Sequence, residues 1–138
     1  MSCNFSRQLL AEWKLGDKCK KEINDLVYIT HDNNKKWWLD LTTGEPLDAQ
    51  KLVPEKLMLT VSELSEAMEG HRKGLMDDKI PARPMFEVEL ADALIRLLDL
   101  AGATGIDLGG AYVEKMCYNR TRKDHTIEAR MAEGGKKY

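Results

Sequence analysis

The chain has 138 residues, of which 43% are hydrophobic and 32% are charged, and its formal net charge is −2 at pH 7. This length suits a single domain, and the balance is typical of a globular protein rather than a disordered one. A net charge so close to zero provides no broad basic field, which argues against a nucleic acid as the main partner. We predict one domain over residues 1–138, with its core over 17–123 and a polar tail over 124–138 that forms a loose extension.

The N-terminal stretch and the cysteines favour a cytoplasmic protein without a membrane partner. The opening residues lack a basic stretch followed by a long apolar run, so we expect no signal peptide. No apolar run approaches the length needed to cross a bilayer. The cysteines are odd in number and none belongs to a CxxC pair, which favours reduced thiols over a disulfide or zinc framework. They are Cys3, Cys19 and Cys117.

The first part of the chain predicts helices joined by polar connections. Apolar residues over 5–13 suggest a short opening helix that stops at Gly16. A second helix is predicted by apolar residues that recur at helical spacing over 19–30, and it fades in the polar run 31–36. Residues 37–50 contain two tryptophans and a Thr-Thr-Gly-Glu-Pro turn, so we expect a connection with buried anchors there.

Three further helices complete an all-α fold. The third is predicted to begin near Pro54, which a first helical turn tolerates, and to end at about Gly74. The fourth, over 85–103, is apolar on nearly every side, as is typical of the centre of a bundle or a subunit interface. The last helix follows Asp107 as its N-cap and runs to about Arg122. We expect a four-to-five-helix bundle, assembled as a dimer or a dimer of dimers. On the third helix, the apolar stripe expected to mark the buried side is Leu57, Val61, Leu64 and Met68.

Two pairs of acidic residues stand at helical spacing on the two central helices. Glu63 and Glu66 are neighbours on one face of the third helix and border its apolar stripe. Glu89 and Asp92 repeat this spacing on the fourth helix, where few positions can face solvent. If the two helices pack together, the four carboxylates repel one another and lose hydration. The cost is on the order of several kcal/mol per uncompensated ion. A hard divalent cation removes this cost, so we predict a Mg²⁺ site, in which Mn²⁺ could substitute.

Two other interpretations of these acids remain open. They could be ordinary surface residues of amphipathic helices, although that explains a single ExxE pair better than two pairs in succession. A di-iron bundle would also gather carboxylates, but it needs Glu-x-x-His motifs on its helices. The histidines His31, His71 and His125 do not stand at that spacing from the acids. Iron is therefore disfavoured.

Several other side chains are candidates for binding a nucleotide. Phosphate oxygens would suit the polar residues on the inward face of the last helix, where Arg binds as a fork and Lys as a point charge. The alternative is that these cations extend to solvent or pair with the acids. Lys73, two turns beyond Glu66, is a further phosphate candidate. Trp37 and Trp38 suit the core best, although either could stack on a nucleobase. The inward polar residues are Lys115, Asn119 and Arg122.

Three motifs follow one another over residues 54–123: Glu63-Leu-Ser-Glu66, Glu89-Leu-Ala-Asp92 and Lys115-x-x-x-Asn119-x-x-Arg122. Together they resemble the MazG-like, all-α nucleoside triphosphate pyrophosphatase superfamily. The resemblance implies a Mg²⁺ site at the four acids and obligate association of protomers. It also implies hydrolysis of ribo- or deoxyribonucleoside triphosphates, between the α- and β-phosphates, to a monophosphate and pyrophosphate.

In such an enzyme, Mg²⁺ would neutralise the triphosphate and lower the pKa of a bound water. Glu63 or Glu66 would orient that water or accept its proton, and Lys115 and Arg122 would stabilise charge on the phosphates. A second hypothesis is a non-catalytic helical dimer that binds a metal or a nucleotide in a regulatory or assembly role. A third is a plain structural bundle, which would have no metal affinity.

Overall fold

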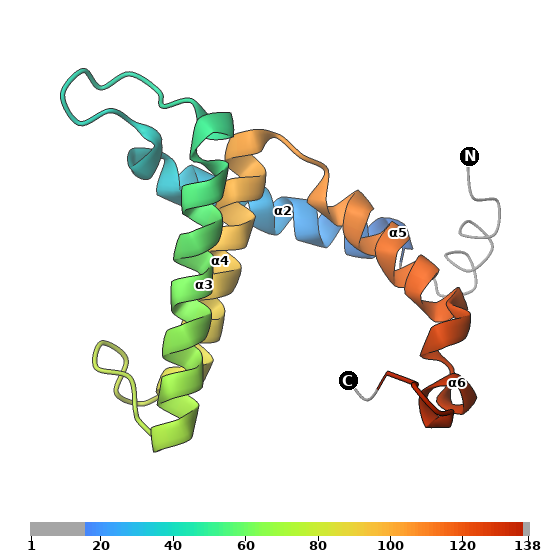
Figure 1. Cartoon of the computed structure of the whole chain (residues 1–138). Helices are drawn as coiled ribbons and strands as arrows, with labels where there is room; N and C mark the ends of the chain where they lie inside the picture. Colours follow the sequence, from blue (N-terminus) through green and yellow to red (C-terminus); the bar gives the residue numbers. More distant parts are fainter. Residues whose placement is uncertain (1–15, 137–138) are drawn as a thin grey trace. The chain divides into compact units, whose positions relative to one another are not determined.

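The computed structural model describes residues 16–136 (Figure 1). These residues form five α-helices and two short 3₁₀ helices and include no named β-strand, so the all-α prediction is confirmed. The opening helix predicted over 5–13 lies outside the described residues. The elements in chain order are α2 (Gly16–Asn34), η1 (Lys35–Trp38), α3 (Ala49–Lys73), α4 (Met85–Thr104), α5 (Leu108–Thr121), η2 (Lys123–His125) and α6 (Ile127–Met131).

The chain divides into two compact units, and each is described by itself. The central unit comprises Leu26–Ile106 and contains α3, α4 and the second part of α2. The terminal unit comprises the described residues 16–25 and 107–136. The single domain, the bundle and the oligomer expected from the sequence stay predictions. Among residues 16–136, no helix is both long enough and apolar enough to cross a membrane.

The start of α3 differs from its prediction. The helix begins at Ala49, because the Asp48 side chain caps it by accepting a hydrogen bond from the Gln50 N–H at 3.1 Å. Pro54 therefore lies inside the helix rather than at its start. The Pro54 ring has no N–H, so the carbonyl of Gln50, four residues earlier, lacks the helical hydrogen bond that another residue would donate. A start near Pro54 was thus wrong because an effective cap lies upstream.

The ends of α3 and α4 agree with the sequence. Gly74 follows α3 with φ 63°, and Gly105 follows α4 with φ 69°. Both glycines adopt the left-handed conformation that residues with a side chain rarely adopt, and their N–H groups satisfy the last carbonyls of the helix. The glycines therefore stop each central helix at a defined residue.

In the central unit, α3 and α4 lie side by side (Figure 1). Their contact is made by small residues: Ala67 on α3 is 2% exposed and Ala93 on α4 is 4% exposed. A Cβ atom added at Gly70 would lie 2.8 Å from Cγ of Met85, so the approach is close there. Small side chains reduce the distance between helix axes. The acids of the two helices are consequently brought within reach of one another.

The apolar stripe of α3 is largely exposed, although it was expected to mark the buried side; two of its members, Leu64 and Met68, line a hollow together with Phe86 and Leu90 of α4. Its four members are between 45% and 65% exposed, whereas α3 buries Thr60, Glu63, Ala67 and Gly70. The prediction that the stripe is buried was wrong, because the residues that α3 buries are mostly small ones. The chain consequently exposes an apolar surface, which we call the α3 stripe: Leu57, Val61, Leu64 and Met68.

In the terminal unit, Asp107 caps α5 as predicted. Its carboxylate accepts hydrogen bonds from the Gly110 N–H at 2.9 Å and from Asn24 at 2.8 Å, and it pairs with Lys20 at 2.7 Å. Hydrogen bonds from Lys20, Asn24 and Gly110 lower the pKa of Asp107 to about 2. These contacts join the first part of α2 to the start of α5.

The described part of the tail carries secondary structure, which differs from the expected loose extension. It forms η2 and α6, and the Thr126 hydroxyl caps α6 by accepting from the Ala129 N–H at 3.1 Å. Asp124 pairs with Arg122 at 2.6 Å and with Lys136 at 2.8 Å. The sequence did not reveal these ion pairs because its polar composition there resembles that of a linker.

Candidate metal centre

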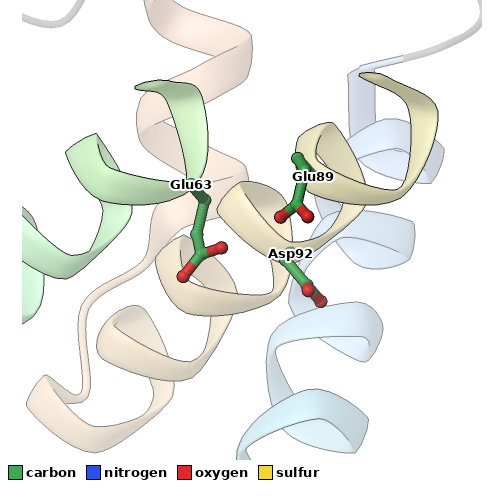
Figure 2. A group of neighbouring side chains, drawn as sticks. All are labelled: Glu63, Glu89 and Asp92. Atoms are coloured by element: carbon green, nitrogen blue, oxygen red, sulfur yellow. The ribbon is translucent and has the colours of Figure 1, made fainter. Parts of the chain in front are cut away.

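Three of the four predicted acids come together where α3 meets α4. Figure 2 shows Glu63 on α3 facing Glu89 and Asp92 on α4. Each offers a carboxylate oxygen, and these three oxygens all lie within 4.8 Å of one another. Glu63 is 7% exposed and Glu89 is 8% exposed, whereas Asp92 is exposed. We call these three residues the carboxylate cluster.

Glu66 stands apart from the cluster. It is exposed on α3, one turn after Glu63, and contributes no oxygen to the group that lies within 4.8 Å. Its charge nevertheless acts on Glu89, because it is among the causes that raise the pKa of that residue. Glu66 is therefore near enough to influence the cluster electrostatically.

Within the cluster, neighbouring carboxylates raise the pKa values of Glu89 and Asp92. The pKa of Glu89 is raised to about 7, first by burial, then by a hydrogen bond with Glu63 and by the charges of Glu66, Glu63 and Asp92. Burial also raises the pKa of Asp92, with the charge of Glu63 as the next cause. Near neutral pH Glu89 is thus partly protonated, and a cation could replace that proton. This arrangement suits a hard cation, which prefers carboxylate oxygens.

A cation that the sequence analysis missed contacts the cluster directly. Arg96 on α4 donates a hydrogen bond from Nε to Glu63 Oε1 at 2.6 Å, and its Nη2 forms an ion pair with the same oxygen at 2.5 Å. The charge of Arg96 also opposes the rise in the pKa of Asp92. A signal was present in the sequence, because Arg96 follows Asp92 by four residues and therefore shares its helix face. It was overlooked among the apolar residues of that helix.

A cavity of about 480 Å³ adjoins the carboxylate cluster. It is lined by Asp92, a member of the cluster, and by Arg96, which pairs with Glu63. A volume of this order is typical of sites for small molecules. Lys56 on α3 and the exposed Trp37 also line the cavity. The wall therefore combines two cations, two carboxylates and an aromatic ring. Its lining residues are Asn34, Trp37, Lys56, Leu59, Asp92, Ile95, Arg96 and Asp99.

The two tryptophans have different environments. Trp38 is 6% exposed, and its indole N–H donates to both oxygens of Asp99, at 3.0 and 2.9 Å. His31 Nδ1 lies 2.8 Å from Asp99 Oδ1, so the buried carboxylate joins both rings. Trp38 is thus the buried anchor that was expected. Trp37 is 63% exposed, so its expected burial was wrong, and it presents the more accessible ring for stacking on a base.

The other predicted phosphate ligands lie elsewhere. Lys73, at the end of α3, contacts Glu69 Oε1 at 2.5 Å and does not line the cavity. Lys115 on α5 lies with Nζ 4.9 Å from the centre of the Tyr118 ring. Arg122 makes two hydrogen bonds to Asp124, at 2.9 and 2.6 Å.

Asn119 on α5 has an unusual environment. Its side-chain oxygen is buried and has no hydrogen-bond partner within residues 16–136. Asn119, Lys115 and Arg122 all belong to the terminal unit, whereas the cluster belongs to the central unit. A shared role in binding phosphates therefore stays a prediction.

The geometry just described is the basis for assigning a function. No family model, curated protein or solved structure matches the chain.

Proposed function

We propose that this protein is a Mg²⁺-dependent nucleoside triphosphate pyrophosphohydrolase, which converts ribo- or deoxyribonucleoside triphosphates to the monophosphate and pyrophosphate. The observation that carries this proposal is the carboxylate cluster beside a cavity lined by Lys56 and Arg96. The resemblance to the MazG-like superfamily supports the choice of substrate and suggests that the chain is a member.

The donor set fits Mg²⁺ better than other common metals. All three residues of the cluster are carboxylates, and two of them are buried, with Arg96 as the cation that pairs with Glu63. Mg²⁺ prefers oxygen ligands and is usually held by a few carboxylates together with water and substrate phosphates. No His or Cys joins the group within the described residues, which disfavours zinc and iron. Glu63, Glu89 and Asp92 would hold the ion, and Glu66 could complete the site.

The side chains around the cavity would have distinct roles in the reaction. A bound Mg²⁺ would supply charge neutralisation and a more acidic water. Glu66, exposed one turn from Glu63, would accept a proton from the attacking water. Lys56 and Arg96 would contact the phosphates, and the exposed Trp37 would stack on the base. Lys115, Asn119 and Arg122 belong to the terminal unit, and their binding of phosphates stays a prediction from the sequence.

The proposal is tested by a turnover screen with all common ribo- and deoxyribonucleoside triphosphates in the presence of Mg²⁺. The expected products are a nucleoside monophosphate and pyrophosphate in equal amounts. Release of orthophosphate instead would contradict the proposed position of cleavage. Metal-dependent nucleotide binding without turnover would favour a regulatory binding protein, and the absence of any metal affinity would favour a structural role.

Metal affinity should depend on pH because of Glu89. Its pKa is raised to about 7, so below that pH a proton must leave before the carboxylate can bind a cation. We expect Mn²⁺ affinity to fall by about tenfold for each pH unit below about 7 and to level off above it. Titration with Mn²⁺ between about pH 5.5 and pH 8 measures this dependence. An affinity that stays constant across the range would show that Glu89 is not a ligand.

The exposed α3 stripe supports the predicted assembly as a homodimer or homotetramer. Met68 is 65% exposed and Leu64 is 47% exposed, and α4 adds Leu94 at 53%. An apolar surface of this kind is typical of a protein interface. We expect Leu64→Glu to dissociate the oligomer in analytical ultracentrifugation, whereas Gln50→Glu, which adds the same charge elsewhere on α3, should not. A wild-type protein that sediments as a monomer at micromolar concentration would contradict the prediction.

A further inference from the structure

The pairing of Arg96 with Glu63 conflicts with metal binding at the same carboxylate. Glu63 offers an oxygen to the carboxylate cluster, yet two nitrogens of Arg96 already hold one of its two oxygens. A divalent cation at the cluster would compete with the guanidinium for Glu63 and would also repel it. Because like charges repel, the two cations disfavour each other at Glu63, even though Arg96 holds only one of its two oxygens.

Exposure indicates that Arg96 is the group that moves. The side chain of Arg96 is 40% exposed, whereas that of Glu63 is 9% exposed. Glu63 is held within the contact between α3 and α4, where its carboxylate has little room to turn. Arg96 lines the cavity next to the cluster, so its guanidinium can leave Glu63 without leaving the site.

Within the cavity, the displaced guanidinium of Arg96 could bind an anion. Lys56 lines the same cavity, so two cations would then face the space beside Asp92. A guanidinium forms two parallel hydrogen bonds to phosphate oxygens, which makes it well suited to a polyphosphate. Arg83, just before α4, does not line this cavity. It is exposed and pairs with Glu87.

We propose that Arg96 is a displaceable counter-ion, which pairs with Glu63 in the metal-free protein and binds the phosphates of the substrate once a divalent cation takes its place. This inference rests on the proposed function and deepens it. It assigns Arg96 a role in coupling metal binding to polyphosphate binding, which a purely structural ion pair would not have.

Arg96→Gln tests the proposal in four measurements on the full chain, with Arg83→Gln as the matched control. The metal-free melting temperature should fall, because Glu63 loses its partner. Mn²⁺ affinity without nucleotide should rise by about tenfold, because the competing cation is gone. Affinity of the Mn²⁺-loaded protein for inorganic tripolyphosphate should fall by about ten- to a hundredfold, and KM for the best nucleotide should rise similarly. Arg83→Gln should change none of these.

A second variant keeps the test decisive if Arg96→Gln folds poorly. Arg96→Lys retains a positive charge for Glu63 but loses the fork, so it should melt like the wild type and still bind tripolyphosphate more weakly. Unchanged Mn²⁺ and tripolyphosphate affinities in these variants would reduce Arg96 to a structural counter-ion. Weaker Mn²⁺ binding by Arg96→Gln would also overturn the proposal, since Arg96 would then position Glu63 for the metal.

The two proposals can fail separately. A wild-type protein that binds Mn²⁺ and tripolyphosphate but releases no pyrophosphate would end the proposed function, and the binding measurements would still decide the role of Arg96. A wild-type protein that binds no Mn²⁺ would overturn both.

Discussion

Excess EDTA is expected to abolish pyrophosphate release, and Mg²⁺ or Mn²⁺ added beyond the chelator is expected to restore it. The reason is that Glu63, Glu89 and Asp92 form a cluster with too little positive charge of its own to bind a triphosphate. Loss of the metal removes both charge neutralisation and the acidic water, so the rate should fall by roughly a thousandfold or more. Rates of pyrophosphate release before and after the addition measure the effect.

The control for this experiment is EDTA that has been saturated with Mg²⁺, which should leave the rate unchanged. Ca²⁺ should bind but support little turnover, because its coordination is larger and looser. Metal should also raise the melting temperature, since it binds only the folded cluster. Full activity in excess free chelator would remove the basis for the proposed metal centre.

Glu89→Gln is expected to reduce kcat by at least about a hundredfold while preserving the fold. The amide keeps the shape of the side chain but cannot supply the anionic oxygen that Mg²⁺ needs. Asp92→Asn, Glu63→Gln and Glu66→Gln should each have effects of similar size, as metal ligands or as the proton acceptor. The matched control is Glu87→Gln, an exposed acid on the same helix that pairs with Arg83 outside the cluster. Steady-state kinetics of the five variants measure the contrast.

Glu89→Gln is also expected to change how the stability of the metal-free protein depends on pH. The folded-state pKa of Glu89 is raised to about 7 from its ordinary value of 4.5, so the folded protein binds more protons than the unfolded chain between these values. The free energy of unfolding of the metal-free wild type should therefore decrease as the pH rises through this window. Glu89→Gln removes this loss, so at about pH 8 it should melt above the wild type, with a smaller difference at about pH 5. Wild-type kinetics in Glu89→Gln would identify the acids as ordinary structural residues.

The helices and their boundaries could largely be predicted from the sequence, because the signals for them are local. The Asp107 cap and the glycines at positions 74 and 105 act within one turn of the chain, so no distant contact is needed to recognise them. The spacing of Glu63, Glu66, Glu89 and Asp92 likewise follows from helical periodicity alone. The start of α3 was missed because Pro54 was given more weight than the Asp48 cap upstream.

Only the tertiary structure decided which side of each helix faces the other. The small residues Ala67 and Ala93 let α3 and α4 approach closely, which buries Glu63 and Glu89 and leaves the α3 stripe exposed. A helical wheel assigns the buried side to the largest apolar residues, whereas here the close approach of the backbones determines it. The same packing brings Arg96 to Glu63 across 33 positions of the chain and places Lys56 at the cavity. Such contacts depend on the relative placement of two helices, which periodicity within either helix does not contain.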